Sequence, residues 1–60
     1  MTVDHAREHI GHRVRYQLGD YVNRGRITYA GRGEIYARLD GEEYPRLVNP
    51  GSLTLAENPR

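Results

Sequence analysis

Arginine and tyrosine are the side chains of this 60-residue chain best suited to chemistry with a partner. All nine basic residues are arginine, whose planar guanidinium group matches phosphate and carboxylate groups. Tyrosine rings add surfaces on which planar groups stack. The candidate binding residues lie at alternate positions of predicted strands: Arg13, Arg15, Arg24, Arg26, Tyr36 and Arg38. This spacing predicts a binding surface on one outer face of a sheet.

Catalytic motifs are missing from the sequence. It contains no Ser-His-Asp order, phosphate-binding loop or dinucleotide-binding glycine pattern. Glu42 and Glu43 are adjacent carboxylates, and a strand would direct them to opposite faces, away from shared acid–base work. We therefore predict that the protein is not an enzyme, takes no small-molecule substrate and uses no cofactor.

Three histidines follow one another at helical spacing. His5, His9 and His12 would share one face of a continuous helix, and a His-x-x-x-His spacing occurs in metal sites. Gly11 is expected to end the helix before His12, and no carboxylate or cysteine is placed to complete a site. The prediction is a solvated histidine face that binds no metal.

Composition limits the class of protein. A net charge of +1 is too balanced to indicate nucleic-acid binding from charge alone. The absence of cysteine excludes disulfides and thiolate metal sites, so association with other chains would be one way to stabilise so small a core. The sequence contains neither an apolar run of about 20 residues nor a signal-peptide pattern, so we expect no membrane contact and a cytoplasmic location.

The central stretch, residues 24–40, predicts a β-hairpin. Its two halves alternate apolar and polar residues, as in strands with one buried side. We expect a three-residue loop at residues 31–33, closed by a left-handed glycine. The inward residues are then Ile27, Tyr29, Ile35, Ala37 and Leu39. The same register places Arg26 opposite Arg38 and Arg24 opposite Asp40, where the arginines either extend into water or bind an anion.

The remaining chain predicts one short arm and three more strands. Residues 1–9 form two helical turns capped by Thr2 or Asp4, or stay loose. Residues 11–18 form a strand with Val14 and Tyr16 inward, and it ends at a turn at Gly19.

The strand expected at residues 42–48 has two possible registers. One turns Tyr44 and Val48 inward and is preferred; the other turns Pro45 and Leu47 inward. A tight turn or 3₁₀ turn at residues 49–52 then leads to a last strand at residues 53–56. We place the domain at residues 10–57, between the arm at 1–9 and a tail at 58–60.

This plan of five short strands with a one-turn element before the last resembles an SH3-like small barrel. The chain is similar to KOW-like and Tudor-like barrels and to small actinobacterial SH3-like proteins of unknown function. The resemblance covers roughly residues 10–56 and rests on the segments at 11–14, 24–27, 35–41 and 47–52. It implies an all-β, five-stranded barrel with a short N-terminal segment.

Together these features predict a small binding module, from a phage or a bacterium. We expect the outer face of the hairpin to be the binding surface. The preferred partner is another protein or a second copy of the chain, because tyrosine and arginine are enriched at protein–protein hot spots. The alternative is nucleic acid bound through the same arginines and Tyr36.

Overall fold

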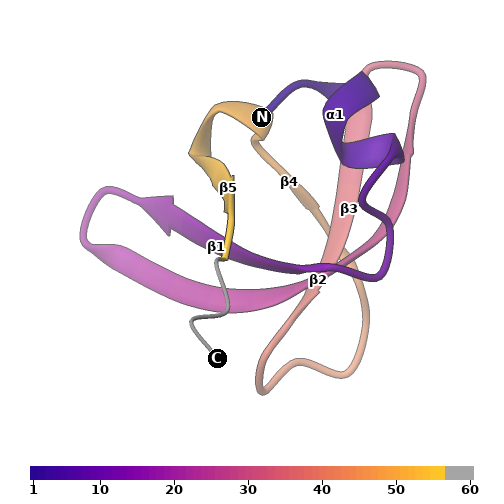
Figure 1. Ribbon diagram of the computed structural model, residues 1–60. Helices are drawn as coiled ribbons and strands as arrows, with labels where there is room; N and C mark the ends of the chain where they lie inside the picture. Colours follow the sequence, from indigo (N-terminus) through magenta and orange to yellow (C-terminus); the bar gives the residue numbers. More distant parts are fainter. Residues whose placement is uncertain (57–60) are drawn as a thin grey trace.

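The computed structural model describes residues 1–56 (Figure 1). It confirms the all-β class, with five antiparallel strands and one short helix. Along the chain these elements are α1 (Val3–Arg7), β1 (Arg13–Leu18), β2 (Tyr21–Gly31), β3 (Glu34–Leu39), β4 (Arg46–Val48), the 3₁₀ turn η1 (Pro50–Ser52) and β5 (Leu53–Leu55). No helix within residues 1–56 is long and apolar enough to cross a membrane. The tail predicted at 58–60 lies outside the described residues.

One long strand, β2, connects the two halves of the sheet. The strand order is β4-β3-β2-β1-β5. β2 pairs with β1 through residues 21–26 and with β3 through residues 25–31, so Gly25 takes part in both pairings. Figure 1 shows β1 and the first part of β2 crossing β3 at a steep angle. Within the described residues β4 and β5 are the two ends of an open sheet, and no pairing closes it into a barrel.

The core lies on the inner face of this bent sheet. Its largest fully buried side chains are Ile27, Ile35, Leu39, Leu53 and Val14. Tyr16 is 6% exposed and also belongs to the core, as the alternation in the first strand predicts.

Helix α1 covers part of this core, as Figure 1 shows beside β2 and β3. Ala6 is fully buried, while Met1 and Val3 pack against the same cluster. The Thr2 side chain accepts a hydrogen bond from the His5 N–H at 3.1 Å and so caps the helix. Of the two expectations for residues 1–9, helical or loose, the structure has a helix at Val3–Arg7.

The predicted hairpin register is right near the sheet centre and wrong at the tip. The pairs Gly25–Leu39, Arg26–Arg38 and Ile27–Ala37 are as expected. Beyond them the register shifts by one residue at a β-bulge, and the loop contains two residues, Arg32 and Gly33, instead of three. Both loop residues have positive φ (55° and 79°), as in a type I′ turn, whose twist matches that of the paired strands.

The bulge changes which residues near the tip are buried. Tyr29 now pairs with Tyr36 and Ala30 with Ile35. Ala30 is 6% exposed, whereas Tyr29 is 47% exposed, so the prediction of an inward Tyr29 is wrong. The extra residue of a bulge moves the side chains that follow it to the opposite face.

The segment before β4 also differs from both expected registers. Val48 is buried, but Tyr44 is 74% exposed and Leu47 is 55% exposed. The strand is only three residues long, because residues 40–45 form an irregular connection that starts with a Glu42 N–H to Leu39 C=O bond of 3.0 Å. Inward placement of Tyr44 is therefore wrong, as is the alternative with Leu47.

Candidate binding face

Five arginines lie together on the outer face of the three central strands. Strand pairing places Arg13 opposite Arg26 and Arg26 opposite Arg38, so these three form one row across β1, β2 and β3. Arg15 is opposite Arg24 in the next row. All five are exposed, and neighbours across such pairs have Cβ atoms about 5 Å apart. We call these five residues the arginine face.

The arginine face is only partly neutralised. Arg13 forms a 3.3 Å ion pair with Asp40, an exposed pair of the kind that contributes about 0–1 kcal/mol. Arg26 Nη1 donates to the Gly11 carbonyl and Arg38 Nη1 to the Glu42 carbonyl, each at 3.1 Å.

The side chains of Arg15 and Arg24 make no hydrogen bond or ion pair within residues 1–56. A guanidinium group has five N–H donors, so most donors on the arginine face remain available to an anion.

A second row, made of apolar side chains, lies beside the arginines. Tyr29 is opposite Tyr36, and Tyr36 is opposite Leu47, so the row crosses β2, β3 and β4. The two rings meet edge to face, with centroids 6.0 Å apart. Tyr36 comes two residues before Arg38 on β3, so the two rows are about 7 Å apart on the same face. We call Tyr29, Tyr36 and Leu47 the apolar row.

Sequence reasoning placed five arginines and Tyr36 on this face and missed Tyr29 and Leu47. For Tyr29 the sequence did contain a signal. A two-residue loop at Arg32 and Gly33, in place of the three-residue loop, pairs Tyr29 with Tyr36 and so places it on the outer face. The register of β4 has no comparable signal, because its neighbouring residues form an irregular connection.

The end of the Tyr29 ring lies close to the glycine two residues later. A Cβ atom built on Gly31 would lie 2.9 Å from Tyr29 Oη and 3.3 Å from its Cζ. The hydroxyl end of the ring therefore lies over Gly31, in the space that the Cβ of a larger residue would occupy. With one side against the glycine, the ring is still 47% exposed.

The histidines form a contact series. Ring centroids are 4.6 Å apart for His5 and His9 and 5.1 Å apart for His9 and His12, both edge to face. His9 Nδ1 lies 2.8 Å from the His5 carbonyl oxygen. Among residues 1–56, no group of three or more His, Cys, Asp or Glu side chains is arranged to hold a metal ion.

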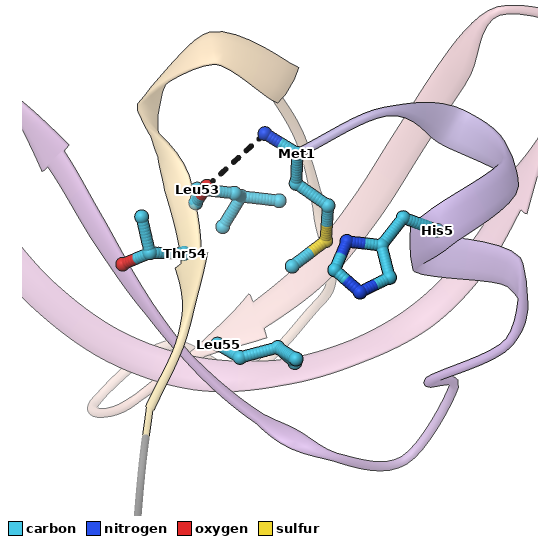
Figure 2. Close-up of a pocket in the computed structure, with 5 residues that line it drawn as sticks. All are labelled: Met1, His5, Leu53, Thr54 and Leu55. Carbon is cyan, nitrogen blue, oxygen red and sulfur yellow. Dashed lines mark hydrogen bonds between the residues drawn. The ribbon is translucent and has the colours of Figure 1, made fainter.

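A small pocket of about 220 Å³ lies between α1 and β5 (Figure 2). It is lined by Met1, His5, Leu53, Thr54 and Leu55. The Met1 amino group donates to the carbonyl oxygens of Pro50 at 2.9 Å and Leu53 at 3.4 Å, and its side chain extends toward the His5 ring. These contacts fasten the start of the chain to η1 and β5, and the lining offers few polar groups for a ligand.

Comparison with protein-family models, with curated proteins and with solved structures finds no match for this chain.

Proposed function

We propose that this protein is a small non-catalytic binding module whose arginine face binds nucleic acid. We also propose that its sheet is an SH3-like small barrel. Three features support the barrel: five strands, the 3₁₀ turn η1 before the last strand, and a long β2 shared by both halves of the sheet.

The observation that carries the functional proposal is the row of Arg13, Arg26 and Arg38 across three strands. Like charges placed directly opposite one another destabilise a sheet, so this row costs the fold some stability. A bound phosphate backbone would remove that repulsion and accept the available guanidinium donors. Because Asp40 is the only acidic side chain paired with this face within residues 1–56, the repulsion is mostly uncompensated.

A different protein is the second candidate partner, and the apolar row favours it. Tyr29 and Leu47 are exposed beside arginines, and tyrosine and arginine are enriched in interface hot spots. A second copy docked through the same face is disfavoured, since a two-fold interface sets each patch against itself and would bring ten guanidinium groups together (five from each copy). A protein partner would therefore need acidic groups around an apolar centre.

Binding of a fluorescein-labelled oligonucleotide, followed by anisotropy across a salt series, tests the proposal. The double variant Arg26→Gln/Arg38→Gln removes two charges from the arginine face and keeps much of each stem. The matched control, Arg7→Gln/Arg46→Gln, removes two charges that form exposed ion pairs elsewhere.

For a single strand the logarithmic salt slope is about −0.7 for each phosphate neutralised, so the double variant should reduce it by about 1.4 while the control leaves it unchanged. Equal binding by both variants, or no binding by the parent even at about 50 mM salt, would overturn the proposal. A partner protein captured only when Tyr29 and Leu47 are intact, with little salt dependence, would favour the second candidate.

A further inference from the structure

Tyr29 and Gly31 are in contact on the outer face of the sheet. Phosphate binding by the arginine face does not require this contact. The tyrosine ring occupies the space above the glycine, where an added Cβ would lie 2.9 Å from Oη. Gly31 is not in the left-handed region, so backbone conformation does not require glycine there. An added Cβ would therefore require only the Tyr29 ring to shift, since every atom that it meets belongs to that side chain.

On the outer face of the sheet, the row that contains Tyr29 neighbours a row of positive charge. Tyr29 pairs with Tyr36, which precedes Arg38 by two residues on β3, and Arg38 pairs with Arg26. The arginine row and the apolar row are thus separated by about 7 Å. A nucleotide has a similar arrangement, because its anionic phosphate is set to one side of a planar, weakly polar base.

We infer that Tyr29 is the stacking platform for a base of single-stranded nucleic acid, with Gly31 as its positioning residue. This inference rests on the proposed function and names the form of nucleic acid bound. The phosphates lie on Arg26 and Arg38 while the base lies on the open side of the Tyr29 ring. Base–aromatic stacking suits any sequence, since every base has a π-face. Duplexes are poorer ligands, because their bases are paired and stacked inside the helix.

Four variants test the platform, with a short oligothymidylate and a duplex of the same length as probes. Tyr29→Phe keeps the ring and should bind oligothymidylate like the parent. Tyr29→Leu keeps apolar bulk without the ring and should bind about 5- to 150-fold more weakly, the fold-change equivalent to one lost stacked base. Tyr44→Leu, at a tyrosine that is 74% exposed outside the apolar row, is the matched control and should have no effect.

The fourth variant, Gly31→Ala, tests the positioning role. The added methyl group should move the Tyr29 ring away from residue 31. Weaker nuclear Overhauser contacts between the ring and the backbone of residue 31 would show this movement. Its loss of affinity should resemble that of Tyr29→Leu, and combining the two should give no further loss, because both remove the same platform. Additive losses would show that Gly31 acts on its own and would overturn its positioning role. Thermal melts of each variant identify any loss of affinity that comes from unfolding.

The outcomes separate this inference from the broader proposal. A parent that binds neither probe contradicts the proposed function itself. A parent that binds duplex as tightly as oligothymidylate, with Tyr29→Leu unchanged, overturns the stacking platform alone. Preference for the single strand, lost in Tyr29→Leu and kept in Tyr29→Phe and Tyr44→Leu, supports the platform.

Discussion

Replacing Gly25 by alanine should strongly destabilise the protein, because the main chain of β3 leaves no room for a Cβ atom there. A Cβ atom at this position would overlap the Arg38 carbonyl oxygen and lie 2.8 Å from Leu39 Cα and 3.0 Å from the Arg38 carbonyl carbon. All three atoms belong to the main chain, so no side-chain rotation can make room. The two strands would have to separate at the pair that includes the fully buried Leu39.

The size of the effect follows from two opposing terms. Extra volume in a packed interior costs about 1–3 kcal/mol, and a clash with main-chain atoms, which cannot rotate away, belongs at the upper end. Alanine also stiffens the unfolded chain, which returns about 0.4–1 kcal/mol. We therefore expect the free energy of unfolding to fall by about 2 kcal/mol. A chain of 60 residues has about 3–9 kcal/mol in total, so this loss is a large fraction.

Urea denaturation followed by circular dichroism measures the effect. With a denaturant slope of about 1 kcal/mol per molar for so small a protein, the midpoint should fall by about 2 M. Gly51→Ala is the matched control, because the nearest atom to its added Cβ is Asn49 Oδ1 at an ordinary 3.6 Å and its φ is not positive. If the two variants had the same midpoint, the close approach of β2 and β3 at Gly25 would be refuted.

Three further stability predictions use the same denaturation assay. Arg32→Asn should raise stability by about 0.5–1 kcal/mol, because Arg32 has a φ of 55° and asparagine tolerates that conformation better; a loss would argue against the two-residue loop. Thr2→Ala should lower stability by about 1 kcal/mol through loss of the helix cap, whereas an unchanged midpoint would mean that α1 does not depend on the cap. Leu39→Ala should cost about 2–5 kcal/mol, and tolerance of this change would contradict the core.

Alternation along the chain was sufficient to predict the centre of the hairpin. Apolar residues at every second position fix which side of a strand is buried, and Ile27, Ala37 and Leu39 all lie inside as expected. The same alternation cannot detect a bulge. One extra residue exchanges the inward and outward faces of the residues that follow it, and no particular residue type is required at a bulge. Tyr29 was assigned to the core for this reason. It is exposed because the twist of the strands favours a two-residue turn, and that turn pairs Tyr29 with Tyr36 on the outer face.

The arginine face was also partly predictable. Alternate positions predicted that Arg13, Arg15, Arg24, Arg26 and Arg38 share one outer face, and strand pairing shows that they do. Their role in binding is a prediction. The surroundings of Leu47 were beyond sequence reasoning, since the connection at residues 40–45 has no repeating pattern and its path depends on contacts such as that of Arg38 with the Glu42 carbonyl.

Mapping of backbone amide chemical shifts during titration with oligothymidylate tests the binding face most directly. If nucleic acid binds the arginine face, the largest changes should occur at Arg13, Arg26, Tyr29, Tyr36 and Arg38, on one face of three adjacent strands. Amides of α1 and of the pocket beside β5 should change little. Spectra that do not change at any ratio of oligonucleotide to protein, or changes confined to α1 and β5, would contradict nucleic-acid binding at this face.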